Sequence, residues 1–142
     1  MSKHQAMIDY IGRFPPISNK WLYFDYIDDD REKEAISPIV QEITQFDIMG
    51  NKIGQYDFAI ILTRPYSKAT DDVNIQNMDF IDLWIEWLIE QNYDRVLPDF
   101  GAKFEVTSVK NLSNMGDLAQ TYDSGMGKYM LLCRVEYIEW RK

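Results

Sequence analysis

The chain has 142 residues, of which 46% are hydrophobic and 27% charged, and its formal net charge is −8. A chain of this length can bury about 68–70% of the surface that its unfolded form exposes, so residues 1–142 are expected to form a single domain without disulfides or metal ions. The acidic balance argues against a protein that binds nucleic acid, whether generally or at a specific sequence, because phosphate contacts need clustered Lys and Arg.

The single cysteine, Cys133, rules out an intrachain disulfide and a cysteine-based metal site. The N-terminal segment lacks the apolar stretch of a secretion signal, and every apolar run is shorter than a bilayer span. We therefore expect a protein that is in the cytoplasm at least during synthesis and has no membrane partner.

The first half of the chain predicts a helix followed by three strands. Residues 2–13 place apolar side chains at helical spacing after Ser2, a favoured N-cap. Residues 20–27 are aromatic and suit a strand. Residues 36–47 predict a strand that forms a hairpin with residues 55–64, whose apolar residues on both faces are typical of a central, covered strand.

A turn, a second helix and two further strands complete the predicted elements. Residues 48–54 contain the Gly and Asn residues of the hairpin turn, and residues 74–93 predict a helix. Residues 102–110 and 128–140 predict strands, whereas residues 111–127 have no apolar period and predict a long loop. The expected order is α-β-β-β-α-β-β, and the expected fold class is α+β, a mainly antiparallel sheet with helices packed on it.

Three patterns that suggest enzymes or ion sites lack essential parts. The stretch SGMGKY (124–129) contains the Gly-Lys pair of a phosphate-binding loop, but Tyr122 replaces the first Gly and Tyr129 replaces the Ser or Thr. The three aspartates at 28–30 lack the alternating spacing of a calcium loop, and His4 has no evident partner near the helix start. We therefore expect no catalytic residue, no metal site and no cofactor.

Helix 74–93 carries more apolar and acidic side chains than one core face uses. Its expected core stripe consists of Ile75, Met78, Ile81, Ile85, Leu88 and Ile89. A second apolar stripe consists of Phe80, Trp84 and Trp87. The acidic residues between them are Asp79, Asp82, Glu86 and Glu90.

Two interpretations of this helix stay open. In one, a wide core face lies opposite an acidic face that is only solvated. In the other, a tryptophan anchors a contact with a neighbouring subunit, whose Lys or Arg residues meet the acids. The candidate subunit-interface residues are Asp82, Trp84, Glu86, Trp87 and Glu90.

The chain also resembles a protein family, on stretches that span nearly its whole length. These are MIDYIGRFPP, YDFAIILTRPYS leading into NIQNMDFIDLWIEWLIEQN, and LLCRVEYIEW. In this order they resemble the small minor capsid proteins of phages and prophages of Gram-positive bacteria, which are similar in layout to the tail-terminator (tail-completion) proteins of long-tailed phages. The resemblance implies a tail-terminator-like domain over residues 1–142, with a structural rather than enzymatic role.

The resemblance also implies partners and a location. Such proteins form a ring, usually hexameric, at the head-proximal end of the tail, and contact the tail tube protein and the head–tail connector. DNA passes through the lumen, where a negative wall repels it at short range and lets it slide. The implied location is the head–tail junction of the virion, after assembly in the host cytoplasm.

Three alternative functions stay open. The first is another neck protein of the same class, namely a head-closure or tail-tube subunit. The second is an acidic protein that mimics DNA and inhibits a nuclease, for which carboxylates should be spread in rows over most of the surface. The third is a small hydrolase with two converging carboxylates.

Overall fold

The computed structural model describes residues 2–16, 22–24, 33–39, 45–65, 72–112, 117–121 and 125–141. Its elements in chain order are α1 (Lys3–Ile11), β1 (Leu22–Phe24), β2 (Lys33–Ile39), β3 (Gln45–Phe46), β4 (Lys52–Pro65), α2 (Asp72–Tyr93), β5 (Phe104–Asn111), β6 (Asp117–Thr121) and β7 (Met126–Glu139). The expected α+β class is confirmed, and the five main strands follow the expected order around the two helices. The short strands β3 and β6 are additional.

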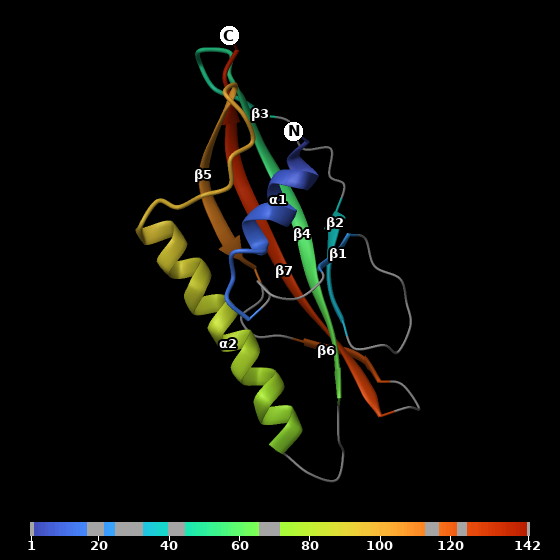
Figure 1. The fold of residues 1–142 in the computed structure, drawn as a ribbon. Coiled ribbons are helices and arrows are strands. Elements are labelled where there is room, and N and C mark those ends of the chain that lie inside the picture. Colours follow the sequence, from blue (N-terminus) through green and yellow to red (C-terminus); the bar gives the residue numbers. More distant parts are fainter. Residues whose placement is uncertain are drawn as a thin grey trace.

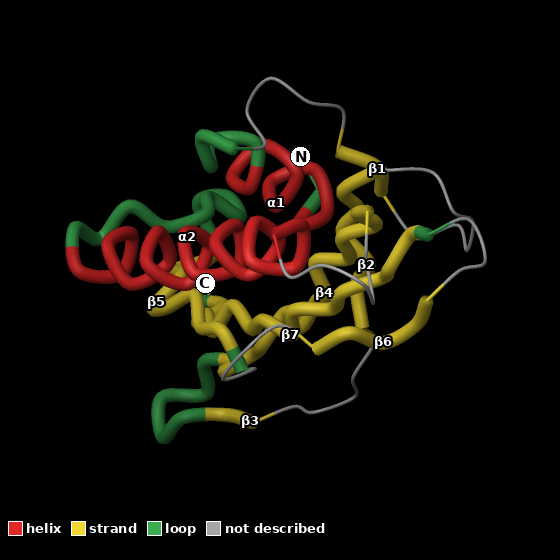
Figure 2. The backbone as a smooth tube through the Cα atoms, turned by 90° about the horizontal axis from the view of Figure 1, so that it is seen from below, coloured by secondary structure: helices red, strands yellow, loops and turns green. Residues whose placement is uncertain are grey.

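The described strands form one sheet, with the main order β1-β2-β4-β7-β5. The short strand β3 pairs with β4, and β6 pairs with β7. Only the pairing of β1 with β2 is parallel; the other described pairings are antiparallel. Both helices pack on the same face of the sheet (Figures 1 and 2).

The centre of the sheet is the long ladder between β4 and β7, which runs from Lys52 opposite Glu139 to Pro65 opposite Met126. One face of these two strands is buried under the helices, with Tyr56, Phe58, Ile60, Leu62, Leu131, Cys133, Val135 and Tyr137. On the other face of β4, Ala59 and Ile61 are also buried. The prediction of a central strand that is covered on both faces is therefore confirmed.

Helix α1 forms as its sequence predicts. The Ser2 hydroxyl accepts a hydrogen bond from the backbone N–H of Gln5 at 3.1 Å, which satisfies one free N–H of the first turn. The apolar positions Ala6, Met7, Tyr10 and Ile11 are buried against the sheet and α2. Pro15 and Pro16 cannot continue the helix, because they lack the backbone N–H that an α-helix needs.

Two expected boundaries in the first half of the chain are corrected. The predicted strand 36–47 is split between β2 and β3, with residues 40–44 outside the described ranges. The predicted turn at 48–54 is shorter, because β4 already begins at Lys52. Within the predicted strand 20–27, the description covers β1 alone, and the aspartates at 28–30 also lie outside it.

Two expectations in the second half are also corrected. The predicted loop 111–127 contains strand β6, which pairs with β7, and β7 itself begins at Met126. In β5, whose sequence alternates Phe104, Val106 and Ser108 on one expected face, a register shift falls between Val106 and Ser108, so the next buried residue after Val106 is Val109. A bulge of this kind inserts one extra residue and turns the following side chains to the other face.

Neither helix, as far as its residues are described, combines the length and the apolar character needed to cross a membrane.

Candidate functional site

The core face of α2 differs from the predicted stripe. Ile81, Trp84 and Leu88 are fully buried, whereas Ile89 is 64% exposed. Trp84 packs edge-on against Phe14, with ring centroids 5.2 Å apart. The candidate interface therefore has to be corrected at Trp84, because a side chain without exposed surface cannot anchor a neighbouring subunit.

The other candidate residues of α2 lie on the surface. Asp82, Glu86 and Glu90 are exposed, and Trp87 is half-buried. Trp87 stacks on Trp84, with ring centroids 5.6 Å apart, and lies 5.3 Å from Phe14. Tyr10 is a third aromatic neighbour, 5.3 Å from Trp87, and these contacts hold the Trp87 ring in place, so its free edge is a rigid apolar surface.

A groove runs along this edge, between α2 and the segment that follows α1. It has a volume of about 260 Å³ and is lined by Phe14, Pro15, Pro16, Leu83, Glu86, Trp87 and Glu90. We call it the Trp87 groove. It brings together three of the five predicted residues, Glu86, Trp87 and Glu90, and it leaves out Asp82 and Trp84.

The exit from α1 builds one wall of the Trp87 groove. Gly12 ends the helix and its N–H donates to the Ile8 carbonyl, while the Phe14 N–H donates to the Ile11 carbonyl at 3.0 Å. This turn directs the Phe14 ring into the core, where it is 1% exposed. Pro15 and Pro16, which follow, line the groove together with residues of α2.

The chemistry of the Trp87 groove suits contact with a protein. Its floor is apolar, and Leu83 on its rim is 50% exposed. The carboxylates of Glu86 and Glu90 also lie on the rim. Within the described residues, no salt bridge involves Glu86 or Glu90. An apolar centre with a polar rim is the usual arrangement of a protein interface, and the volume is below that of most small-molecule pockets, about 300–1,000 Å³.

A second exposed apolar surface lies at the β3–β4 turn, at the end of the sheet near the C-terminus (Figure 1). We call residues 46–53 the hairpin tip. Its exposed apolar side chains are Phe46, Ile48, Met49 and Ile53. Ile48 is fully exposed and Met49 is 72% exposed.

The hairpin tip is held by hydrogen bonds. The Asp47 carboxylate accepts the backbone N–H groups of Met49 and Asn51, both at 2.9 Å, and the Gly50 N–H donates to the Asp47 carbonyl at 3.1 Å. Gly50 has φ 81°, a conformation that glycine adopts without steric cost. Hydrogen bonds from Asn51 and its neighbours hold the pKa of Asp47 below its usual value.

Sequence reasoning did not single out the hairpin tip, although a signal was present. The central residues of such turns are usually polar or Gly, because they face water. Here they are Ile48 and Met49, between an Asp and a Gly that suit the turn itself. Apolar residues at the two most exposed places of a well-formed turn indicate a contact surface.

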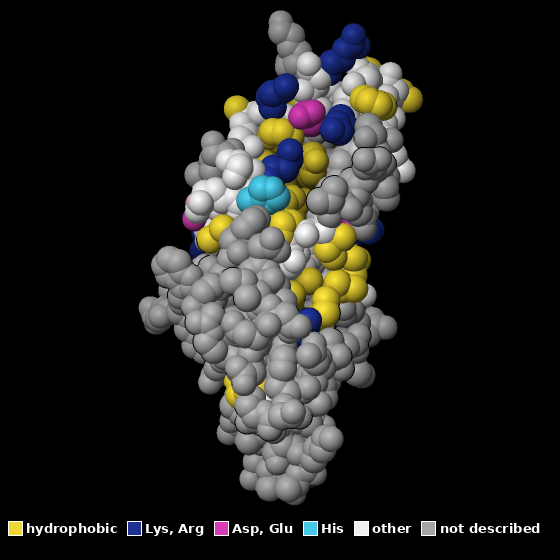
Figure 3. All heavy atoms as spheres, turned by 90° about the vertical axis from the view of Figure 1, so that its right-hand side faces the viewer, with side chains coloured by type: hydrophobic (Ala, Val, Ile, Leu, Met, Phe, Trp, Pro, Cys, Tyr) yellow, Lys and Arg dark blue, Asp and Glu magenta, His cyan; other side chains and the backbone are white. Residues whose placement is uncertain are grey.

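Basic side chains lie in and beside the hairpin tip, and Figure 3 shows Lys and Arg gathered at this end of the molecule. Lys52 begins β4, and Arg141 lies so close to Gly50 that an added Cβ would meet its Nη1 at 3.1 Å. The Arg141 N–H donates to the Asn51 side chain at 2.8 Å. Lys3 is a further basic residue near Lys52, and the Lys3 Nζ lies 4.4 Å from the centre of the Phe104 ring. Burial, more than the charge of Lys52, lowers the pKa of Lys3.

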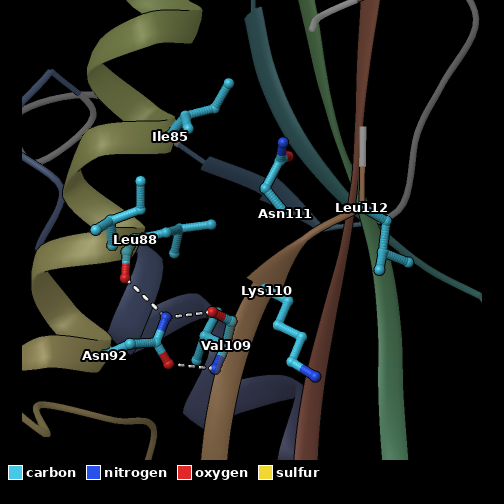
Figure 4. A pocket seen from close by; sticks show the side chains of 8 residues that line it. Ile85, Leu88, Asn92, Val109, Lys110, Asn111 and Leu112 are labelled. Atoms are coloured by element: carbon cyan, nitrogen blue, oxygen red, sulfur yellow. Dashed lines mark hydrogen bonds between the residues drawn. The ribbon is translucent and has the colours of Figure 1, made fainter. Parts of the chain in front are cut away.

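A third surface, the α2–β5 pocket, has a volume of about 390 Å³ (Figure 4). Its lining residues are Ile85, Leu88, Ile89, Asn92, Val109, Lys110, Asn111 and Leu112. The Asn92 side chain accepts the Val109 N–H at 2.9 Å and donates to the carbonyls of Val109 and Leu88. Arg95 donates to the Thr107 carbonyl at 3.0 Å.

These bonds have a consequence for strand β5. It ends the main strand order, so its outer edge carries backbone groups that another strand could pair with. Asn92 and Arg95 occupy three of those groups. Association by strand addition at this part of β5 is therefore disfavoured.

His4, Tyr56 and Cys133 belong to residue types that often take part in catalysis. His4 is exposed, and, contrary to the expectation that it has no evident partner, its Nδ1 lies 2.7 Å from the Tyr56 hydroxyl. Burial raises the pKa of Tyr56 to about 12 and that of the fully buried Cys133 to about 12, which keeps both groups protonated at neutral pH. Within the described ranges, no group of three His, Cys, Asp or Glu residues is placed to hold a metal ion.

Comparison of the sequence with models of protein families finds no match, and comparison with curated proteins finds none either.

Proposed function

We propose that this chain is a structural protein of a phage virion that forms a ring at the head-proximal end of the tail. The ring ends the growth of the tail tube and joins the tail to the head. The proposal starts from the resemblance to minor capsid and tail-terminator proteins. One observation carries it further: two of the apolar surfaces that the described residues expose differ in charge, since the Trp87 groove has acidic side chains on its rim and the hairpin tip has basic side chains in and beside it.

The charges of these surfaces favour a ring over a two-fold dimer. A two-fold contact places the same patch of both copies face to face. Paired in that way, two Trp87 grooves would bring Glu86 and Glu90 of both copies together, and like charges in an interface disfavour binding. A head-to-tail contact between unlike patches avoids this repulsion, and it generates a ring when the rotation closes.

The remaining partners follow from the proposed position in the virion. One side of the ring contacts the tail tube protein and the other contacts the head–tail connector. DNA crosses the lumen without being bound, which suits a chain of net charge −8. The same two surfaces would also serve another neck protein, and the head-closure subunit is the second candidate.

The alternative of a DNA mimic is less well supported. A mimic needs carboxylates in rows over most of its surface, whereas the exposed acids of α2 occupy one helix face. Lys52 at the start of β4 and Arg141 beside Gly50 belong to the end of the sheet near the C-terminus (Figure 1), where they would repel a nuclease surface that binds DNA.

The direct test is to interrupt the gene in the phage or prophage that encodes the chain and to image the particles after lysis. We expect filled heads beside unjoined tails, many of them overlong, because an uncapped tube continues to add subunits. Expression of the intact chain from a plasmid should restore joined particles. Joined particles with tails of normal length in the interrupted strain would contradict the proposal.

A further inference from the structure

We infer that the hairpin tip of one copy docks in the Trp87 groove of the next copy, and that Lys52 of the tip and Arg141 beside it face Glu86 and Glu90 on the groove rim. This inference rests on the ring proposed above and specifies how its subunits join. Its occupant is a second copy of the same chain.

The two surfaces match in polarity. The hairpin tip presents Ile48 and Met49 on a narrow turn, and the groove presents an apolar floor with the half-buried Trp87 ring. Methionine adapts its shape to irregular apolar surfaces and makes favourable contacts with aromatic rings. Aromatic residues that line a pocket are the usual anchors of protein interfaces.

The two surfaces also match in charge. Lys52 follows Gly50 at the start of β4, the Arg141 side chain lies against Gly50, and the Arg141 N–H donates to the Asn51 side chain. Glu86 and Glu90 lie one helical turn apart on α2, so both carboxylates line the same side of the groove. Opposite charges around an apolar contact steer the encounter and fix its orientation.

The hairpin tip is organised before it binds. Asp47 and Asn51 hold the turn, and the Arg141 backbone ties the C-terminal segment to it. A preformed turn loses little conformational entropy on docking, which is the main cost that a flexible loop would add. The exposure of Ile48 and Met49 to water is unfavourable in the isolated protomer, which is consistent with a role of both side chains in binding.

The tip and the groove of one protomer are too far apart in the fold to meet. The tip lies at the end of the sheet near the C-terminus, and Figure 2 shows β3 on the side of the sheet opposite α1 and α2. The groove lies along α2 itself. A contact between these surfaces must therefore join two copies. A single contact of this kind is head-to-tail, because it joins unlike surfaces.

Cross-linking between differently labelled copies tests this contact. One preparation carries Met49→Cys and a second carries Leu83→Cys; they are mixed at a concentration where the chain associates and treated with a short bismaleimide. We expect a covalent dimer that contains one copy of each. The matched control replaces Leu83→Cys with Ile89→Cys, because Ile89 is exposed on the same helix but lines the α2–β5 pocket. The native Cys133 is fully buried and should not react.

Reversing the charges on each surface tests the same contact independently. The variant Lys52→Glu with Arg141→Glu makes both surfaces acidic, and the variant Glu86→Lys with Glu90→Lys makes both surfaces basic. Each variant alone should associate at least about tenfold more weakly than the native chain. An equal mixture should regain association, because every tip then meets a groove of opposite charge. A misfolded variant could not be rescued in this way.

The outcomes separate the inference from the proposed function. Rings without the Met49–Leu83 cross-link, or a mixture that is not rescued, would overturn the docking inference and leave the ring in place. Equal cross-linking at Leu83 and Ile89 would also overturn it. A native chain that shows no self-association in sedimentation at any concentration would overturn both.

Discussion

Asp47 and Asn51 are joined by three hydrogen bonds: the Asn51 backbone N–H and side-chain amide each donate to the Asp47 carboxylate, and the Asp47 N–H donates to the Asn51 carbonyl. The two residues enclose Ile48 and Met49, which face water in the protomer. The chain thus builds a rigid support for two apolar side chains that contribute nothing to its own core. This relationship motivates the view of the hairpin tip as a docking element.

The first prediction concerns Ile48 and Met49. Changing both to Ser should leave the free energy of unfolding within about ±0.5 kcal/mol of the native value, because neither side chain is buried. Self-association, measured by sedimentation velocity, should be lost. The control is Ile89→Ser, which removes an exposed isoleucine from another surface and should leave association intact. Loss of association in both variants would indicate a general apolar effect and count against the tip.

The second prediction concerns the acidic face of α2. Glu86→Gln with Glu90→Gln should weaken association and reduce its dependence on salt, because both carboxylates line the groove. Asp82→Asn should leave association unchanged, since Asp82 is exposed outside the groove. Melting temperatures should change little in either variant. Equal effects of the two changes would mean that net charge, not the groove, controls assembly.

The third prediction is a pH dependence of the hairpin tip. Hydrogen bonds, above all from the Asn51 N–H, lower the pKa of Asp47 in the folded protein. A lowered pKa means that the carboxylate stabilises the tip at any pH above its unfolded pKa, about 3.9, and that this stabilisation is lost as the pH falls through the lower, folded pKa. The pH-dependent shift of the Met49 and Asn51 amide NMR signals should therefore have its midpoint below about pH 3.9. This shift should be absent in Asp47→Asn, and a midpoint above that pH would contradict the prediction.

The fourth prediction compares two ion pairs of the sheet. Asp57 has a side chain that is 3% exposed and accepts two hydrogen bonds from Arg134, whereas both members of the Lys110–Glu136 pair are exposed. Arg134→Ala should cost about 3 kcal/mol of unfolding free energy, because it leaves a buried carboxylate unpaired. Lys110→Ala should cost less than about 1 kcal/mol. Urea denaturation measures both, and equal costs would contradict the difference in burial.

The sequence was sufficient to predict the elements with strong periodic patterns. The core face of β4, the last strand and the Ser2 cap of α1 follow from alternation and helical spacing alone. The α+β class follows from the same patterns. These features depend on local sequence, so a single chain carries enough information to predict them.

The errors have physical causes that depend on tertiary contacts. Apolar residues surround much of α2, so spacing alone did not decide whether Trp84 or Ile89 would face the core; the position of Phe14 does. The bulge in β5 and the pairing of β6 depend on β7, which is distant in sequence. The hairpin tip was missed because exposure of Ile48 and Met49 depends on how tightly the turn closes.

The central claim is that copies of this chain join head-to-tail, with the hairpin tip of one copy in the Trp87 groove of the next. Electron microscopy of the purified, concentrated protein tests it most directly, with the Ile48→Ser, Met49→Ser variant imaged beside it at the same concentration. We expect closed rings with an open lumen for the native chain and separate protomers for the variant. A two-fold dimer of the native chain at every concentration would contradict the claim, as would rings of the variant that match the native ones.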